Sequence, residues 1–560
     1  MDNASELIVY KASAGSGKTF TLAVEYIKLL IQNPRAYRHI LAVTFTNKAT
    51  TEMKERILSQ LYGIASGDKA SDPYLQNIKE RTGLSENEIC ERSARALSFL
   101  IHDYSFFRVE TIDSFFQSVM RNLARELGLG ANLEISLNND EVLDKAVNTL
   151  IEKLDRSSLV LIWLVDFIKD KIANDKRWHV TKEIKSFARN IFNEIYVERG
   201  NGLREKLRDP SYITQYKKKL ESLAAQKKDE MCSFADQFFG VLEANGIEPE
   251  QLKGGKNGIM SYFKKLKNGE YDDKVRNKTV ENCLDNEQNW STKTSALKEE
   301  IISLASEELI PLLRTCEEFR PVNNRIINSC ILSLRYLNQL RLLTYIDEEV
   351  RELNTKENRF LLSDTTNLLY RLMKEGDSSF VFEKIGSNIR HVMIDEFQDT
   401  SRMQWNNFKL LLLEGLSQGT GSLVVGDVKQ SIYRWRNGDW GILNSLNEKL
   451  GPYPIREEKL VVNRRSESNI IRFNNEFFAK ACEWLNAGYQ DEFGEDCQTL
   501  LSAYKELAQQ SPKKEEKGYV RIQFLDKKEG KSYSEVTLDE LGLSVEELVL
   551  RGVSLSDITI

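Results

Sequence analysis

The chain has 560 residues, more than one hydrophobic core usually supports, so its length predicts several domains. Its net charge of −6 excludes a positive field over the whole surface, and any nucleic-acid partner would bind in a local groove. Seven scattered cysteines without a CxxC pair argue against a zinc or iron–sulfur site, and without an evident signal or long apolar run we expect a soluble, cytoplasmic protein.

The first predicted element is an apolar strand at residues 7–9, followed by a small-residue turn at 14–17 and a helix that opens with Lys18 and Thr19. The two glycines of the turn allow backbone N–H groups to converge on phosphate oxygens. Lys18 can reach the β- and γ-phosphates, and Thr19 can bind Mg²⁺. The pattern predicts a phosphate-binding loop.

The loop departs from the GxxxxGK[ST] pattern because Ala12 stands at its first glycine position. A glycine-rich turn before an ordinary helix is the alternative interpretation. Apolar residues spaced by four, three and four favour the helix that a strand–turn–helix unit requires, and they are Phe20, Val24, Ile27 and Ile31.

Further strands are predicted at residues 39–46 and 108–112, each followed by a helix, and Asp113 is placed to cap the second of these helices. Strands that alternate with helices predict a parallel, doubly wound sheet.

From about residue 130 to 360 the alternation stops and the sequence becomes helix-rich, with an amphipathic segment at 327–350. We expect an inserted α-helical domain. Basic runs at 217–219 and 264–267, the second beside Tyr262 and Phe263, could contact nucleic acid, although solvated helix faces are the favoured interpretation.

Strands are expected again at 391–395 and 422–427, and a further strand at 459–463 is expected to begin a second lobe. Residues 519–524 alternate as a half-buried strand does. Residues 554–560 resemble the beginning of another strand, so we expect the chain to be the N-terminal piece of a longer protein.

Two adjacent carboxylates, Asp395 and Glu396, follow the apolar strand at 391–394. Asp395 can hold Mg²⁺ while Glu396 orients and deprotonates a water molecule. An acidic strand end alone is usually a surface turn, but beside a phosphate-binding loop the catalytic interpretation is favoured.

Gln430 follows the next strand and is suited to sensing a γ-phosphate through a hydrogen bond. The residues after it interleave arginines with Tyr433 and Trp435, a composition that suits stacking on unpaired bases. Packing of Trp435 in the core is the alternative. Arg465 could reach the nucleotide from a second lobe, or belong to a surface arginine pair.

In this order the stretches resemble the motifs of the UvrD/Rep family of superfamily 1A DNA helicases, closest to the RecB/AddA helicase-nuclease branch. The motifs are ASAGSGKT at 12–19, VTFTNKATTEMKERI at 43–57, VETIDSFF at 109–116, VMIDEFQDTS at 392–401, VVGDVKQSIYRWRNGD at 424–439 and VVNRRSESNIIRFNN at 461–475.

The resemblance implies an α/β, RecA-like P-loop NTPase with a parallel sheet. Domain 1A would comprise residues 1–125 and 371–450, the α-helical insertion 1B residues 126–370, and a truncated domain 2A residues 451–560.

The resemblance also implies the site residues. Catalytic roles would fall to Lys18, Glu396, Gln430 and Arg465, and Mg²⁺ would be held by Thr19 and Asp395. ATP would be bound by Ala12, Ser13, Ala14, Gly15, Ser16, Gly17, Lys18 and Thr19. Single-stranded DNA would be contacted by Phe45, Thr46, Asn47, Thr111, Tyr433 and Trp435.

Three features depart from the family pattern. The sequence has no glutamine upstream of the phosphate-binding loop that could read adenine, and Asp113 replaces the usual histidine of its motif. Motifs V and VI, with a second arginine, are absent from the 560 residues.

The resemblance implies an ATP- and Mg²⁺-dependent 3′→5′ single-stranded-DNA translocase or helicase of recombination and repair. Its partners would be single-stranded or tailed duplex DNA and a second helicase-nuclease subunit. The alternative is an ATP- and DNA-binding module without turnover. An RNA helicase of the Upf1-like branch is disfavoured by QSIYRWRNGD and by the large insertion.

Overall fold

The structure is a computed structural model that describes residues 6–123, 134–136, 139–155, 160–162, 164–165, 168–169, 180–292, 294–357, 359–361, 369, 389–451, 453–526 and 530–560. The chain divides into two compact units. The first comprises Met1–Phe115 and Ser379–Ile560, and the second Phe116–Ser378.

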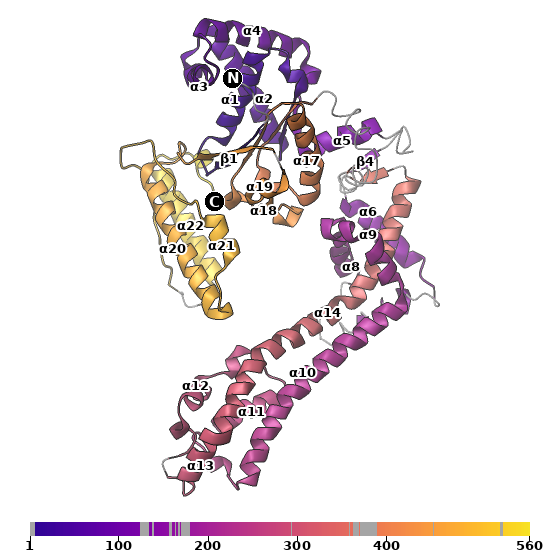
Figure 1. The fold of residues 1–560 in the computed structure, drawn as a ribbon, viewed down its shortest axis with the longest axis vertical. Helices are drawn as coiled ribbons and strands as arrows, with labels where there is room; N and C mark the ends of the chain where they lie inside the picture. The colour runs from indigo at the N-terminus through magenta and orange to yellow at the C-terminus, as the bar shows by residue number, and fades with distance from the viewer. Residues whose placement is uncertain are drawn as a thin grey trace. The chain divides into compact units, whose positions relative to one another are not determined.

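The first unit is built on a parallel sheet with the strand order β3-β2-β6-β7-β1-β8 in the described part of the chain (Figure 1). The α/β class and the parallel sheet predicted from the sequence are therefore confirmed. The strands are β1 (Leu7–Ala12), β2 (Ile40–Thr44), β3 (Val109–Thr111), β6 (His391–Ile394), β7 (Ser422–Gly426) and β8 (Ile455–Leu460).

The central strands of the sheet are buried because their side chains are mostly apolar. Every residue of β2 and β7 is buried, as is typical of a parallel sheet covered on both faces. The helix after β1 packs its apolar residues on the sheet, and these include Leu22, Val24, Ile27 and Ile31. Because all strands are parallel, the loops that follow β1, β6 and β7 emerge at the same edge of the sheet.

The first unit also contains helices, which lie on either side of the second unit in the sequence. Those that begin before the second unit are α1 (Lys18–Gln32), α2 (Asn47–Ser66), α3 (Asp72–Thr82), α4 (Glu86–His102) and α5 (Ile112–Leu123). Those after it are α17 (Arg402–Ser417), α18 (Gly441–Asn444), α19 (Leu446–Lys449), α20 (Ser468–Phe493), α21 (Gln498–Tyr504) and α22 (Tyr533–Leu550).

Three strand predictions in the last part of the chain are wrong. The strand expected at 459–463 is β8, which begins earlier and pairs with β1 in the first sheet instead of opening a second one. Residues 519–524 form no strand, and their side chains are exposed with no partner strand beside them in the described residues. Residues 554–560 contain a short 3₁₀ turn at Leu555–Asp557.

The second unit is helical, as the sequence predicted. Its helices are α6 (Asn139–Glu152), α8 (Val180–Ala188), α9 (Glu194–Arg208), α10 (Pro210–Ala244), α11 (Ile259–Lys267), α12 (Lys278–Asp285), α13 (Lys298–Leu304) and α14 (Ile310–Lys356). Two short strands, β4 (Glu134–Ser136) and β5 (Arg359–Leu361), pair in parallel.

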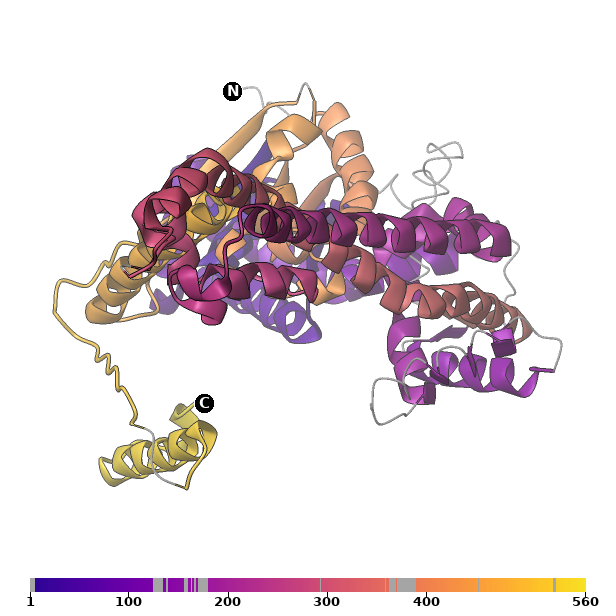
Figure 2. The same cartoon turned by 90° about the horizontal axis from the view of Figure 1, so that it is seen from below.

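Two long helices, α10 and α14, run side by side in both views of the ribbon (Figures 1 and 2). The amphipathic segment predicted at 327–350 lies within α14. Its buried residues include Leu337, Leu343, Ile346 and Val350, whereas Ile331 is exposed. In the part of the chain that the structure describes, no helix combines the length and the apolar character that crossing a membrane requires.

Candidate active site

The turn between β1 and α1 is closed by its own serines. Ser16 Oγ donates a hydrogen bond to the carbonyl oxygen of Ser13 at 2.7 Å and accepts one from the Ser13 backbone N–H at 3.1 Å. Gly15 and Gly17 have φ values of 70° and 90°, a region that glycine enters without steric cost. Among the residues that the structure describes, no side chain caps α1, so its first N–H groups are available to an anion.

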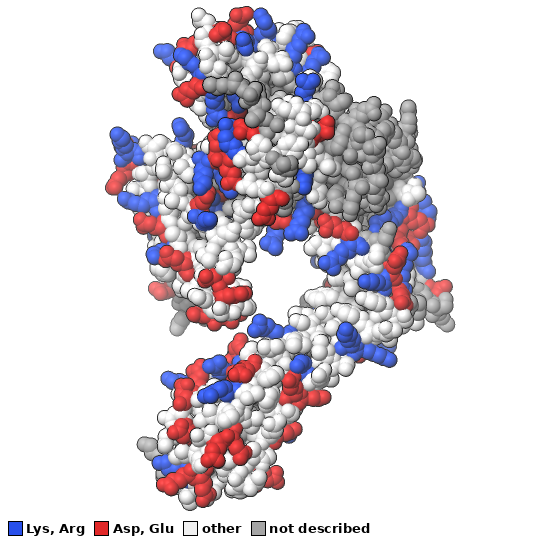
Figure 3. All heavy atoms as spheres, viewed as in Figure 1, with Lys and Arg blue, Asp and Glu red and all other residues white. Residues whose placement is uncertain are grey.

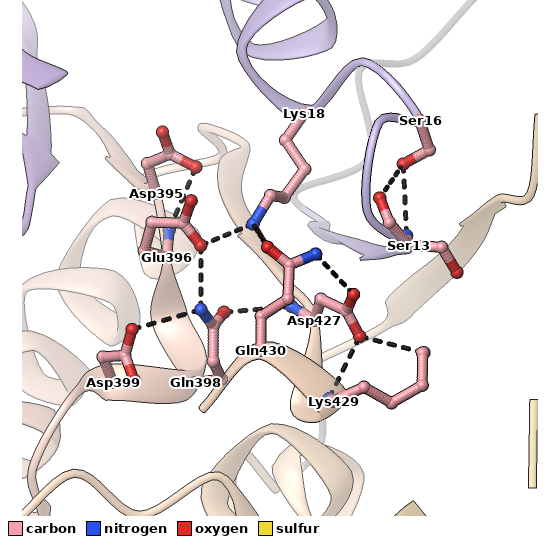
Figure 4. A network of polar contacts seen from close by, with 10 residues as sticks. All are labelled: Ser13, Ser16, Lys18, Asp395, Glu396, Gln398, Asp399, Asp427, Lys429 and Gln430. Carbon is pink, nitrogen blue, oxygen red and sulfur yellow. Dashed lines mark hydrogen bonds and ion pairs between the residues drawn. The ribbon is translucent and has the colours of Figure 1, made fainter. Parts of the chain in front are cut away.

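Lys18, the first residue of α1, contacts side chains from two other strand ends (Figure 4). Its Nζ donates to Glu396 Oε2, after β6, at 2.5 Å and to Gln430 Oε1, after β7, at 3.3 Å. Three residues predicted from separate motifs, as many as 412 positions apart, therefore meet at one edge of the sheet.

Glu396 adopts a left-handed backbone conformation, with φ 49° and ψ 42°. A non-glycine residue rarely occupies this region, and such strain is concentrated at functional sites. The conformation turns the chain directly after β6. The Glu396 backbone N–H donates to Asp395 Oδ1 at 3.0 Å.

Asp395 is buried, with 5% of its surface exposed. Burial raises the pKa of its carboxyl group to about 6, the negative charge of Glu396 adds to this, and Lys18 acts in the opposite direction. A cation beside Asp395 would stabilise its ionised form. The Thr19 hydroxyl and the Asp395 carboxylate are oxygen donors of the kind that Mg²⁺ prefers.

The donor set for a metal is small. In the described ranges no group of three or more His, Cys, Asp and Glu side chains is placed to hold a metal ion. Magnesium at Thr19 and Asp395 would therefore complete its shell with water and phosphate oxygens, as Mg²⁺ does in phosphoryl-transfer sites. The residues present fit that arrangement.

Arg465 lies in the loop after β8, which packs on the phosphate-binding loop. The Arg464 backbone N–H donates to the Gly15 carbonyl at 2.9 Å. A Cβ on Gly15 would come within 2.4 Å of Asn463 Oδ1 and 2.9 Å of Arg465 Cβ. Arg465 is thus brought to the tip of the loop from the sheet that carries the loop.

An aromatic cluster, formed by Phe45, Tyr433 and Trp435, lies in the same unit. Phe45 and Tyr433 are stacked with 4.7 Å between ring centroids, and Tyr433 and Trp435 are 6.0 Å apart. The Arg436 guanidinium lies over all three rings, at 5.8, 5.5 and 4.6 Å from their centroids. Trp435 is 72% exposed, so core packing does not explain it.

The threonines predicted to contact DNA cap helices. Thr46 accepts from the Ala49 backbone N–H at the start of α2, and Thr111 accepts from the Ser114 N–H at the start of α5. The prediction that Asp113 caps this helix is therefore wrong, because Asp113 lies within its first turn. Asn47 is exposed at the beginning of α2.

The basic runs of the second unit are on solvated helices. Tyr262 and Phe263, beside the second run, are buried, and Phe263 stacks on Phe238 at 4.0 Å. They offer no rings to a base. Lys267 pairs with Asp236 at 2.7 Å, and Figure 3 shows red and blue side chains interspersed over α11 to α14 on the face in view.

Gln398 and Asp427 were not predicted as site residues, although both are buried and bonded to the predicted residues. Gln398 Nε2 donates to Glu396 Oε2 at 2.8 Å, and Asp427 Oδ2 accepts from Gln430 Nε2 at 2.7 Å. Both lie inside motifs that were recognised. Polar residues directly after buried strands were the available signal.

Comparisons with known proteins show what this chain is similar to. The profile of the UvrD/REP helicase N-terminal domain matches residues 3–451. The chain is 24% identical over 509 residues to the RecBCD enzyme subunit RecB of Haemophilus influenzae, covering 85% of this chain and 40% of that protein. It is 25% identical over 506 residues to the exonuclease/helicase subunit RexA of Lactococcus lactis subsp. cremoris, covering 84% and 38%. The chain thus spans about two fifths of these relatives.

Proposed function

Because the chain belongs to the UvrD/REP helicase family, we propose that it is an ATP-dependent motor that moves 3′→5′ along single-stranded DNA in recombination and repair. The observation that carries this proposal is the contact of Lys18 with both Glu396 and Gln430. It joins a phosphate-binding loop, a carboxylate and an amide at one edge of a parallel sheet.

Each residue of the site has a role in this proposal. The backbone of residues 12–17 and Lys18 bind the phosphates of ATP, while Thr19 and Asp395 hold Mg²⁺, which neutralises charge on the phosphate oxygens. Glu396 orients the attacking water and accepts its proton. Arg465 stabilises charge on the transferred phosphoryl group from the tip of the loop.

The aromatic cluster is the proposed nucleic-acid interface. Bases stack on Trp435 and Tyr433, with Asn47 and the helix caps at Thr46 and Thr111 near the backbone. Arg436 adds a positive charge to the same surface. Gln430 passes the state of the γ-phosphate to this stretch, which begins one residue after it.

The proposed domain division follows the family. Residues 1–125 and 371–450 form domain 1A, residues 126–370 form 1B, and residues 451–560 contribute to 2A. A second RecA-like lobe would close on the nucleotide and supply the second arginine. Strand β8 does not belong to such a lobe, because it is part of the first sheet.

Hydrolysis assays test the proposal. ATP turnover by a polypeptide that contains this chain is expected to rise with single-stranded DNA, and movement to be 3′→5′ on tailed duplexes. Turnover that does not respond to DNA would refute a DNA motor. Competition between DNA and RNA oligonucleotides in one binding assay would separate this function from an RNA helicase.

A second function, an ATP- and DNA-binding module without turnover, is proposed for the 560 residues alone. It is favoured because motifs V and VI do not occur in them and because the chain spans about two fifths of its relatives. Rapid DNA-stimulated hydrolysis by the 560-residue chain would refute this second proposal. Membership of a helicase-nuclease with a second subunit remains a proposal from the relatives' names.

A further inference from the structure

Gln398 is buried, with 1% of its surface exposed, and both ends of its amide are engaged (Figure 4). Its Nε2 donates to Glu396 Oε2 at 2.8 Å and to Asp399 Oδ2 at 3.2 Å. Its Oε1 accepts from the Asp427 backbone N–H at 2.9 Å. A buried amide with both ends bonded is fixed in orientation.

The backbone around Gln398 leaves it little freedom. A Cβ on Gly426, the last residue of β7, would lie 3.0 Å from Gln398 Oε1 and 3.3 Å from its backbone nitrogen. The end of β7 therefore packs directly on this amide, and movement of Gln398 requires movement of the turn after β7.

These bonds close a ring of side chains. Lys18 donates to Glu396 and to Gln430, and Gln430 Nε2 donates to Asp427 Oδ2 at 2.7 Å. Asp427 donates through its backbone to Gln398, which donates back to Glu396. Gln398 joins the carboxylate after β6 directly to the backbone of the turn after β7.

A branch leads from this ring to the aromatic cluster. Ser431 Oγ donates to the Gln398 carbonyl oxygen at 3.4 Å. Burial raises the pKa of Asp399, whereas the backbone N–H groups of Tyr433 and Ile432 lower it, so these groups act on the carboxylate that Gln398 contacts. Tyr433 in turn stacks on Phe45.

We propose that Gln398 is a positioning residue that couples the nucleotide site to the nucleic-acid surface. Phosphate bound by Lys18 competes with Glu396 for its ammonium group. Glu396 then bonds differently to Gln398, and the turn that carries Asp427 and residues 431–433 shifts with it. This inference rests on the proposed function, and it adds to Gln430 a second connection through the residues after β6.

Coupling of this kind has a measurable, reciprocal form. If nucleotide changes the affinity for single-stranded DNA by some factor, DNA changes the affinity for nucleotide by the same factor. A residue that only supports the fold would change each affinity without changing this factor, so the factor separates coupling from stability.

The test uses the 560-residue chain, fluorescein-labelled oligo(dT) and AMP-PNP with Mg²⁺. The oligonucleotide Kd is measured with and without AMP-PNP, and the two values are expected to differ by at least about fivefold. In Gln398→Met, which keeps the side-chain length without donors, the ratio is expected to fall to about one, with the Kd for AMP-PNP alone within about twofold of the parent value.

Two further variants sharpen the result. Gln398→Glu keeps an acceptor for the Asp427 N–H but loses the donor to Glu396 and Asp399. In this variant, too, the ratio of the two oligonucleotide Kd values is expected to fall to about one. Gln404→Met removes a capping bond of α17 that lies outside the ring. Its ratio of oligonucleotide Kd values is expected to equal that of the parent chain. If Gln398→Met does not fold, Gln398→Glu decides.

The outcomes are distinguishable. A parent chain that binds neither AMP-PNP nor oligo(dT) overturns the proposed function and the inference together. A parent chain that binds both without a change in ratio, or a Gln398 variant that folds and keeps the parent ratio, overturns the inference alone. Loss of the ratio in the Gln398 variants but not in Gln404→Met supports it.

Discussion

The Lys18 ammonium group contacts the Glu396 carboxylate and the Gln430 amide. A triphosphate that binds Lys18 would have to compete with these two groups. The Lys18 side chain is only 11% exposed, so its contact with Glu396 is partly protected from water. A phosphate offers more charge and more acceptor oxygens than one carboxylate, so it can displace Glu396 from the ammonium group. The residues proposed to bind and hydrolyse nucleotide are therefore in contact with one another in this structure.

Lys18→Ala is expected to weaken nucleotide binding by about 10- to 150-fold, because it removes charge-assisted hydrogen bonds worth about 1.5–3 kcal/mol. Titration with a fluorescent ATP analogue measures this. Lys69→Ala, which removes an exposed lysine outside the site, is the control. Equal affinity in both variants would argue against a phosphate-binding role for Lys18.

Gly15→Ala tests the contact between the phosphate-binding loop and the loop after β8. Gly67 has nearly the same φ, 73° against 70°, but a Cβ there would meet nothing within 4 Å. Both alanine variants are expected to lose about 1–2 kcal/mol of unfolding free energy through backbone strain. Only Gly15→Ala is expected to lose more and to weaken nucleotide binding, because its Cβ would collide with Asn463.

Chemical denaturation and ATP-analogue titration of the two variants provide the measurements. If both lost the same unfolding free energy and bound nucleotide as the parent does, the close packing at Gly15 would have no role in the site.

Motif residues were predictable from sequence because strand ends in a parallel sheet converge, whatever the strand order. Lys18, Glu396 and Gln430 each follow a predicted strand, and the structure brings their side chains into contact. The ring that Gln398 and Asp427 complete was not predictable, since it depends on β6 and β7 being neighbours in the sheet.

At the scale of elements, β6 and β7 are joined at their beginnings by a histidine. His391 Nδ1 lies 2.8 Å from the Gly421 carbonyl oxygen. Burial lowers the pKa of His391 below its usual value; the bond to Gly421 opposes this, and the positive charges of Arg390, His39 and Lys28 lower the pKa further.

Because the pKa of His391 is lower in the folded than in the unfolded chain, its contribution to stability is present above about pH 6.5 and is lost as pH falls below that value. His391→Gln lacks this titration. The difference in unfolding free energy between parent and variant is expected to shrink from about pH 7.5 to about pH 5, measured by urea denaturation. A constant difference would show that His391 does not titrate in this way.

The turn after β7 presents the aromatic cluster. Trp435→Ala is expected to weaken binding of oligo(dT) by about 5- to 150-fold, since stacking contributes about 1–3 kcal/mol per base. Trp484→Ala on α20 is the matched control, because that indole is 76% exposed and outside the cluster. Fluorescence anisotropy measures both, and a similar loss in each would place the interface elsewhere.

Buried strands were predicted to within a few residues because their apolar runs are continuous. Strand β8 was misplaced because its pairing part, Ile455–Leu460, is polar and half exposed, as an edge strand can be, while the apolar run lies at its end. Residues 519–524 have the alternation of a strand, but alternation alone does not supply a partner.

At the scale of the whole molecule, loss of strand–helix alternation located the helical insertion. The second compact unit comprises Phe116–Ser378, and the boundaries 126–370 of the insertion stay a prediction. Its basic runs were also placed correctly on solvated helices, because lysines on a long helix usually pair with neighbouring acids. The proposed second lobe beyond β8 is not tested by this fold.

The most direct test of the motor is single-stranded-DNA-stimulated ATP hydrolysis by a polypeptide that contains this chain with motifs V and VI, compared with its Glu396→Gln variant. The variant keeps the shape of Glu396 but cannot accept a proton. We expect turnover to fall by about 10²- to 10⁴-fold while ATP and oligo(dT) still bind. ATP turnover that does not rise with single-stranded DNA, or that is unchanged in Glu396→Gln, would contradict the proposal of a DNA motor.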